Sequence, residues 1–158
     1  MRAGKPEPFL QTQFNETNPA FSPDGRWLAY QSTASGKDEV YVRAFPTPSS
    51  GEGGKWQISN TGGTAPAWSG NGREVLYQSG DQVMSVSYTV NGDSFIAERP
   101  RVWVSKLGGA TGFDLAPDGK RLVVVRPVAA RNAPTQEHTV VFVQNFFNEL
   151  RRRVPTGK

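Results

Sequence analysis

The sequence contains few side chains that could carry out acid–base or nucleophilic chemistry. Its single histidine, His138, begins a predicted strand beside Glu137, and cysteine is absent. Ser-His-Asp catalysis would have to use this residue, but a histidine at a loop or strand end is more often a surface residue than a catalytic one. We therefore expect no catalytic residue.

Short motifs for metal or nucleophile chemistry are missing as well. The sequence has no Gly-x-Ser-x-Gly turn, no His-x-x-x-His pair and no Asp-x-Asp-x-Asp-Gly loop. Without cysteine, thiolate ligands are excluded too. We therefore expect neither a metal nor a cofactor.

The net charge of +4 is concentrated at the C-terminal end. Lys+Arg 18 minus Asp+Glu 14 gives +4, and Arg151, Arg152, Arg153 and Lys158 account for all of it. A basic end could bind nucleic acid or another acidic partner, but no basic face with interleaved aromatic residues accompanies it. Nucleic-acid binding through this end is an alternative that predicts strongly salt-dependent retention on DNA.

The N-terminal residues and the hydropathy pattern bear on localisation. No apolar run approaches the roughly 18 residues that a membrane helix needs, and no signal-peptide core follows Met1. The sequence, taken as it stands, predicts no membrane span and a cytoplasmic protein.

An internal repeat supplies the elements that would position any site. The segments 19–32 and 66–79 align without a gap, and a third copy follows at 113–125. The copies recur every 47 residues, which is in the range of propeller blades and longer than leucine-rich or ankyrin repeats.

Each copy carries the same turn between its first two predicted strands. In the first copy (Ser-Pro-Asp-Gly) and the third (Ala-Pro-Asp-Gly), the turn supplies proline for a type I turn, aspartate for the next position and glycine for the left-handed residue of a bulge. In the middle copy, Gly-Asn-Gly keeps an asparagine and the glycine that this geometry needs. The predicted structural turn residues are Pro23, Asp24, Gly25, Asn71, Gly72, Pro117, Asp118 and Gly119.

The strand that leaves each turn is apolar without strict alternation. Such a pattern is expected where both faces of a central strand are buried between neighbouring sheets. Third strands are predicted at 39–45, 83–88 and 139–144, and fourth strands at 55–59 and 101–105.

Four strands in 47 residues indicate a propeller blade, so the chain is predicted to be one all-β domain, 1–158, of about three four-stranded blades. The blades are expected at approximately 14–60, 61–107 and 108–146.

The two ends of the chain depart from this pattern. Residues 145–153 predict a short C-terminal helix with Asn145 as its N-cap, so the third blade lacks a fourth strand. Conversely, residues 8–12 predict a fourth strand whose own blade is missing.

These motifs resemble the Pro-Asp-Gly, WD-like β-propeller repeats of TolB-like modules. The specific part is Ser22-Pro-Asp-Gly25 with Trp27-Leu-Ala-Tyr30 behind it. The segments Glu39-Val-Tyr-Val-Arg43 and Trp56-Gln-Ile-Ser59, with the end Asn145-Phe-Phe-Asn-Glu-Leu150, are similar to the C-terminal part of propeller sensor regions of bacterial serine/threonine kinases. The resemblance implies a sensor module, often periplasmic or extracytoplasmic in related proteins. No kinase signature accompanies it.

Members of that family usually carry six or more blades, whereas this chain holds about three. An open half-ring exposes two blade faces and a sheet edge. If each face carries roughly 600 Å² of apolar area, covering it contributes on the order of 15 kcal/mol. We expect a C2 homodimer that forms one six-bladed ring, with residues 8–12 of each chain completing the third blade of the other. A half-propeller monomer is the alternative.

Ligand binding is expected at the mouth of the central channel, where loops from all blades converge. The turns between second and third strands and between fourth and first strands lie at this end, as does the long connection 127–137. The candidate contacts are Lys37, Asp38, Thr64, Arg131 and His138.

The sequence thus predicts a non-catalytic propeller that serves as a ligand-sensing or protein-interaction scaffold. The competing class is a hydrolase or lyase with a site at the channel mouth, which convergent ionisable side chains would indicate. A platform of tryptophan rings for a flat ligand is a further alternative, but recurrence at strand positions favours a role in the core between blades. The tryptophans are Trp27, Trp56, Trp68 and Trp103.

Overall fold

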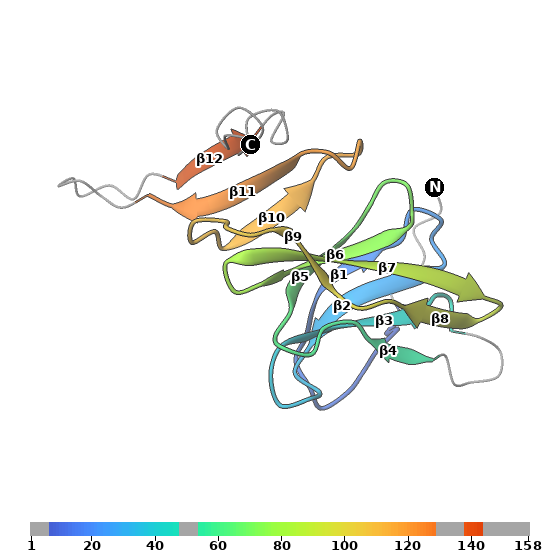
Figure 1. Cartoon of the computed structure of the whole chain (residues 1–158). Helices are drawn as coiled ribbons and strands as arrows, with labels where there is room; N and C mark the ends of the chain where they lie inside the picture. Colours follow the sequence, from blue (N-terminus) through green and yellow to red (C-terminus); the bar gives the residue numbers. More distant parts are fainter. Residues whose placement is uncertain (1–6, 48–53, 129–137, 144–158) are drawn as a thin grey trace.

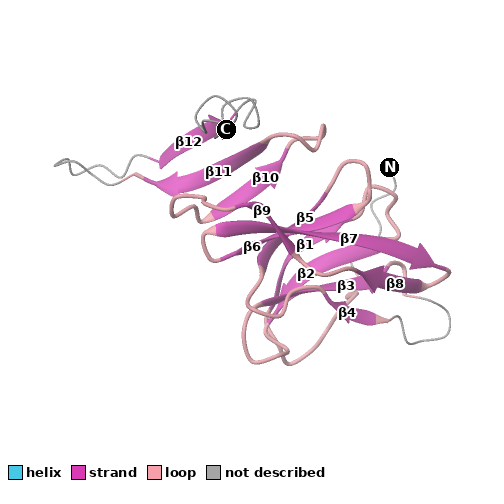
Figure 2. Ribbon diagram, viewed as in Figure 1, coloured by secondary structure: helices cyan, strands magenta, loops and turns pink. Residues whose placement is uncertain are grey.

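The structure is a computed structural model that describes residues 7–47, 54–128 and the strand 138–143 (Figure 1). The described residues form twelve strands and no helix, so the predicted all-β class is confirmed (Figure 2). The predicted helix at 145–153 lies outside the described residues. The strands form three antiparallel sheets, each made by one repeat, which we call blades 1, 2 and 3.

The blades follow one another along the chain, and the first strands of blades 2 and 3 each pack against the blade before them. Blade 1 has the order β1 (Glu16–Phe21), β2 (Trp27–Ser32), β3 (Glu39–Ala44) and β4 (Lys55–Gln57). Blade 2 contains β5 (Thr64–Trp68), β6 (Glu74–Ser79), β7 (Gln82–Asn91), β8 (Ser94–Ala97) and β9 (Arg101–Val104). Blade 3 contains β10 (Gly112–Leu115), β11 (Leu122–Pro127) and β12 (His138–Val143).

Blade 2 differs from the predicted four strands because β7 is longer than expected. Its first half pairs with β9, the predicted fourth strand, and its second half pairs with the additional strand β8. A two-residue loop joins β7 to β8, and Gly92 at its first position has a φ of 58°. Glycine adopts this left-handed conformation without the steric cost that a side chain would add. The loop residues Gly92-Asp93 are a recognised two-residue hairpin signal, with glycine at the first position.

Residues 8–12 do not form the strand predicted for them. A strand needs a neighbour to receive its backbone hydrogen bonds, and none of the described strands pairs with that segment. Instead, the Phe9 ring packs against Phe45 at a centroid distance of 5.0 Å.

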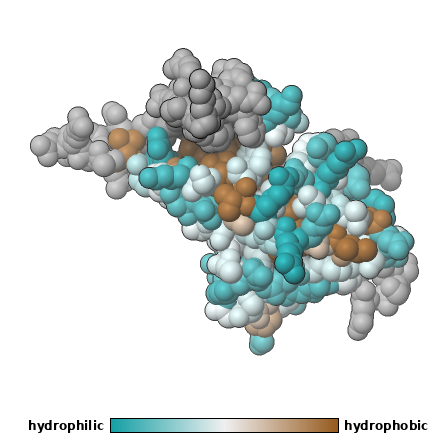
Figure 3. All heavy atoms as spheres, in the orientation of Figure 1, coloured by the Kyte–Doolittle hydropathy of each residue, from teal (hydrophilic) through white to brown (hydrophobic). Residues whose placement is uncertain are grey.

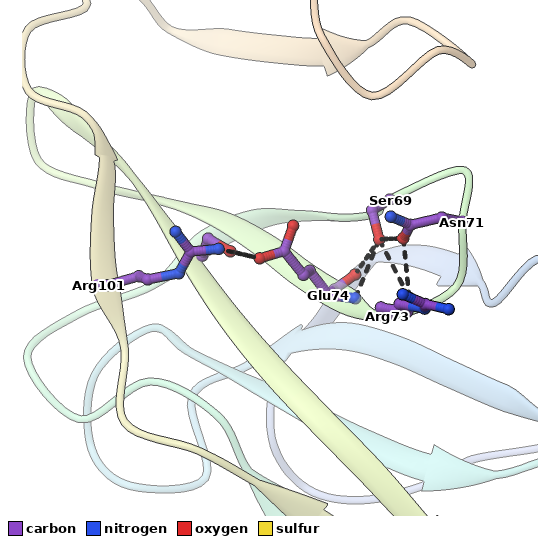
Figure 4. A network of polar contacts seen from close by, with 6 residues as sticks. Ser69, Asn71, Arg73, Glu74 and Arg101 are labelled. Carbon is purple, nitrogen blue, oxygen red and sulfur yellow. Dashed lines mark hydrogen bonds and ion pairs between the residues drawn. The ribbon is translucent and has the colours of Figure 1, made fainter.

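The three turns share one hydrogen-bonding pattern. The N–H of the turn glycine donates to the carbonyl three residues earlier, at 2.9 Å in each turn, and the glycine φ values are 71°, 63° and 66°. The carboxylate or amide at the preceding position accepts from the N–H two residues further on, and Figure 4 shows this contact from Arg73 to Asn71. The donors and acceptors are Gly25 to Ser22, Gly72 to Ser69, and Gly119 to Ala116.

The aspartates of the outer turns predict an acid-dependent loss of stability. The Ser22 hydroxyl, which donates to Asp24, lowers the pKa of that carboxyl below 3.8, and the Lys120 N–H lowers the pKa of Asp118. A carboxyl whose pKa is lower in the folded state stabilises the protein above its unfolded pKa, and this contribution is lost as the pH falls through the folded pKa.

We therefore expect Asp24→Asn with Asp118→Asn to flatten the pH dependence of the melting temperature below about pH 4. Asparagine is a suitable substitute because Asn71 makes the same backbone contact in the middle turn. Parallel melting curves for the variant and the wild type would show that the turn carboxylates do not set the acid sensitivity.

A close steric contact explains why the middle turn has Gly70 where the other two turns have proline. A Cβ built on Gly70 would lie 2.3 Å from the carbonyl oxygen of Pro117, in the turn of blade 3. No side chain fits at that distance, so the middle turn carries glycine where blades 2 and 3 approach each other.

Two apolar clusters hold the blades together. One joins blades 1 and 2 and contains Trp27, Trp68, Tyr77 and Phe95, while the other joins blade 2 to the following connection and blade 3 through Leu76, Val104 and Val124. The central strands β2 and β6 are buried on both faces, as predicted from the lack of alternation between apolar and polar residues. In β6, Val75, Leu76 and Tyr77 are all at most 2% exposed. The tryptophans of these clusters therefore form core.

Phe95 of the additional strand β8 lies in the centre of the cluster between blades 1 and 2, which we call the aromatic seam. Its ring stacks on Tyr88 at 4.5 Å and meets Trp27 at 5.2 Å, Trp56 at 6.0 Å and Trp68 at 6.1 Å. The β7–β8 hairpin thus connects blade 2 to the outer strand of blade 1.

Outside these clusters the surface is largely polar. On the face drawn in Figure 3, hydrophobic residues form small separate patches in a mostly hydrophilic surface. Within the described part of the chain, there is no helix with the length and apolar character needed to cross a membrane.

Candidate functional site at the linker end

One end of the blades gathers the connections that the sequence analysis assigned to the channel mouth. We call it the linker end. It contains the loop from β2 to β3, the turn from β6 to β7, and the two linkers that join one blade to the next. The first linker is 58–63 and the second is 105–111. Backbone hydrogen bonds tie these segments together, because the N–H of Gly63 donates to Asp38 O at 2.9 Å and that of Leu107 donates to Asp81 O at 2.8 Å.

A buried carboxylate organises this end of blade 1. Glu39, the first residue of β3, is fully buried and accepts hydrogen bonds from the Ser59 hydroxyl and, at 3.0 Å, from the N–H of Gly62. Lys37 lies 3.2 Å from the same carboxylate and also donates to the carbonyl of Asn60. The first linker is therefore held in place by charge-assisted hydrogen bonds, which are among the stronger ones in proteins.

Blade 2 uses an equivalent contact in its own linker. The carboxylate of Asp81 accepts from the N–H of Gly109 at 2.8 Å, and Gly109 follows Gly62 by one repeat of 47 residues. Gln78 supports the same linker by donating to the carbonyl of Ala110 at 2.9 Å. In both blades, an acidic side chain at or just before the start of the third strand thus fixes a glycine of the connection to the next blade.

Tyr77 lies beneath the first linker. Burial raises its pKa to about 12, and the negative charge of Glu39 acts in the same direction. The phenol therefore stays neutral at physiological pH, and Tyr77 serves as core rather than as an acid or a base.

Glu16, at the start of the innermost strand β1, was not singled out by the sequence analysis. Its Oε1 accepts hydrogen bonds from the hydroxyls of Thr12 at 2.9 Å and Ser32 at 3.2 Å. Its Oε2 is buried, and no described residue bonds to it. No sequence signal distinguished this glutamate, because its burial depends on the hairpin partner Ser32.

The structure places the predicted contact residues unequally. Lys37 is engaged with Glu39 and Asn60, whereas Asp38 is exposed and Thr64 begins β5 half-buried at the same end. His138 is the first residue of β12 and pairs with Pro127, but its side chain is not described. Arg131 lies outside the described residues.

The chemistry available at the linker end is polar contact rather than metal binding. In the residues that the structure describes, no three histidine, aspartate or glutamate side chains are grouped so that they could hold a metal ion. Two of the acids at this end, Glu39 and Asp81, already bond to backbone N–H groups.

The described residues form antiparallel sheets that pack face to face in chain order, and each sheet has the same turn between its first two strands. This arrangement is an all-β fold similar to that of β-propeller proteins. The comparisons with solved structures agree. The chain is similar to TolB from Acinetobacter baumannii, with 17% identity, 87% of this chain covered and a TM-score of 0.53. It is also similar to an oligogalacturonate lyase from Vibrio parahaemolyticus, with 14% identity, 76% of this chain covered and a TM-score of 0.54.

The match covers 32% of each of those two chains, so this chain spans about a third of their length. At such low identity the likeness shows the fold alone. No family model and no curated protein sequence matches the chain. The TolB-like part of the predicted resemblance is therefore supported by structure, and the narrower similarity to kinase sensor regions stays a prediction.

Proposed function

We propose that this chain is a non-catalytic propeller scaffold whose ring is completed by a second copy. The scaffold binds a protein or a small molecule at the linker end, where Asp38 and Thr64 are accessible. The non-catalytic assignment is supported by Glu39 and Asp81, whose carboxylates already accept hydrogen bonds from linker N–H groups.

One comparison between equivalent residues carries the proposal of a completed ring. Trp68 ends the first strand of blade 2, is 9% exposed, and donates its indole N–H to the carbonyl of Ala20 in blade 1 at 2.9 Å. Phe21 holds the same position one repeat earlier and is 55% exposed. The outward face of blade 1 thus presents a large apolar side chain where a preceding blade would pack.

Blade 3 offers the complementary face. Val125, on the side of β11 away from blade 2, is 43% exposed, and β12 has no fourth strand beside it among the described residues. In a C2 pair, blade 3 of each copy would pack on blade 1 of the other, giving two identical junctions and six blades.

Exchange of residues 8–12 would fill the vacancy beside β12. Phe9 precedes Trp56 of β4 by 47 residues, so the repeat assigns Phe9 to an outer strand of a preceding blade. Edge strands with free N–H and C=O groups readily accept such an added strand.

The solution mass tests this proposal. We expect a mass near twice 17.3 kDa by sedimentation or light scattering, which falls toward the single-chain value when residues 1–13 are deleted. A well-folded single chain at every concentration would contradict the ring of two copies.

The lyase alternative can be tested on the same material. Elimination by a lyase creates an unsaturated product, so incubation with oligogalacturonate would produce an ultraviolet absorbance. We expect none, and turnover would overturn the non-catalytic assignment.

A further inference from the structure

The outward face of blade 1 carries a connected set of three aromatic rings, which we call the aromatic trio. Phe45 lies between the other two, 5.0 Å from Phe9 and 4.8 Å from Phe21. We infer that this trio is the docking surface for blade 3 of a second copy, and that Arg121 of that blade packs against it. The inference rests on the proposed ring of two copies and specifies its junction.

The trio repeats part of the aromatic seam between blades 1 and 2. Phe45 is equivalent to Tyr88, because their N–H groups donate to the carbonyls of Arg26 and Arg73, which are 47 residues apart. The edge-to-face pair of Phe21 and Phe45, at 72°, accordingly matches that of Trp68 and Tyr88, at 82°.

The seam contains two further rings, Trp27 and Phe95, for which the trio has no counterpart in this chain. Trp27 of blade 1 closes the seam, is 1% exposed, and meets Trp56 edge to face at 5.5 Å. Beside the trio the place of Trp27 is open, which agrees with the 55% exposure of Phe21. The missing group must therefore come from a blade that packs there.

Two repeats after Trp27, the same position is occupied by Arg121 of blade 3. The Arg121 side chain is 46% exposed and forms an ion pair with Asp118 at 2.9 Å. A guanidinium packs favourably over aromatic rings, so Arg121 can occupy beside the trio the place that Trp27 occupies in the seam. Asp118 is paired with Arg121 and offsets its positive charge. This offset is needed because Arg43, which donates to the Tyr30 hydroxyl, lies on the same face of blade 1 as the trio.

A second copy is the occupant because its blade 3 would satisfy two requirements at once. It would bring Arg121 to the trio, and it would bring the edge of β12 that no described strand pairs with to the segment that contains Phe9. The junction would also continue the two face-to-face interfaces that already join the blades within one chain.

The test is a charge exchange in the full chain, followed by sedimentation velocity over a range of concentrations. Phe21→Lys places a positive charge against Arg121, and Arg121→Glu removes the cation. We expect each variant alone to weaken dimerisation at least tenfold. An equimolar mixture should restore it, because one junction becomes lysine against glutamate and the other is wild type.

Phe14→Lys is the matched control, since Phe14 is 39% exposed and lies outside the trio. We expect it to leave dimerisation unchanged, and circular dichroism should show all variants folded. Unchanged dimerisation of Phe21→Lys would overturn the inference, as would a mixture that fails to restore it while the wild type dimerises. A wild type that never dimerises would instead refute the underlying proposal of two copies.

Discussion

Replacing Phe95 by alanine is expected to destabilise the protein by about 3–5 kcal/mol, the usual cost of removing a buried phenylalanine ring. The ring is 2% exposed and contacts Trp27, Trp56, Trp68 and Tyr88. Its loss leaves a cavity between two blades, where collapse of the surrounding rings would require the blades to move. Since the total stability of a domain is on the order of 5–15 kcal/mol, a large part of it is at stake.

Urea unfolding followed by circular dichroism measures this effect, and two variants provide its controls. Ile96→Ala removes a side chain of the same strand that is 51% exposed, so we expect a change within about 0.5 kcal/mol. Phe95→Leu should retain more of the stability than Phe95→Ala because it fills more of the cavity. Equal stability of the Phe95→Ala and Ile96→Ala variants would show that the hairpin does not hold the seam together.

The second large effect is expected at Glu39. Replacement by alanine removes the acceptor for the Ser59 hydroxyl and the Gly62 N–H, and leaves Lys37 without its counterion. Buried donors that lose a charged partner cost roughly 1–3 kcal/mol each, so a net loss of about 2–4 kcal/mol is expected. The first linker should also loosen, which faster hydrogen exchange at Gly62 and Gly63 would reveal.

Asp38 provides the matched control for Glu39. Asp38 is adjacent in sequence and its side chain is exposed. Its backbone carbonyl accepts a hydrogen bond from the N–H of Gly63, and alanine would retain this contact. Asp38→Ala should therefore change stability by less than about 0.5 kcal/mol. If Glu39→Ala proved equally mild, the carboxylate would not be what fixes the linker.

Part of the fold could be predicted from local signals in the sequence. The turns could be predicted because their geometry depends on a few adjacent residues, such as Pro23, Asp24 and Gly25. The all-β class followed from the repeat and from strands with two apolar faces. Such local signals act through backbone conformation and need no knowledge of distant neighbours.

The aromatic seam could not be predicted in the same way. Phe95 lies in a strand outside the repeat pattern, and the only local sequence signal for its hairpin is the loop Gly92-Asp93. The predicted third strand of blade 2 ends at Tyr88, whereas β7 continues to Asn91. That the hairpin reaches blade 1 depends on packing between segments about 70 residues apart, such as Trp27 and Phe95.

The linker end was predicted in outline but not in its parts. Lys37 and Asp38 were singled out because they lie in the correct loop, whereas the organising residue is Glu39, the first residue of the following strand. Its burial depends on Ser59 and Gly62, which the strand order brings back beside β3. A charge at the head of an apolar strand gives no sign of whether it faces solvent or a buried donor.

The close approach of Gly70 to Pro117 makes the repeats unequal in a way that matters for engineering. A repeat placed directly before blade 3 needs glycine at the position of Gly70, because a side chain there would meet the Pro117 carbonyl. Exchange of the middle turn for one of the Pro-Asp-Gly turns would therefore require blades 2 and 3 to move apart.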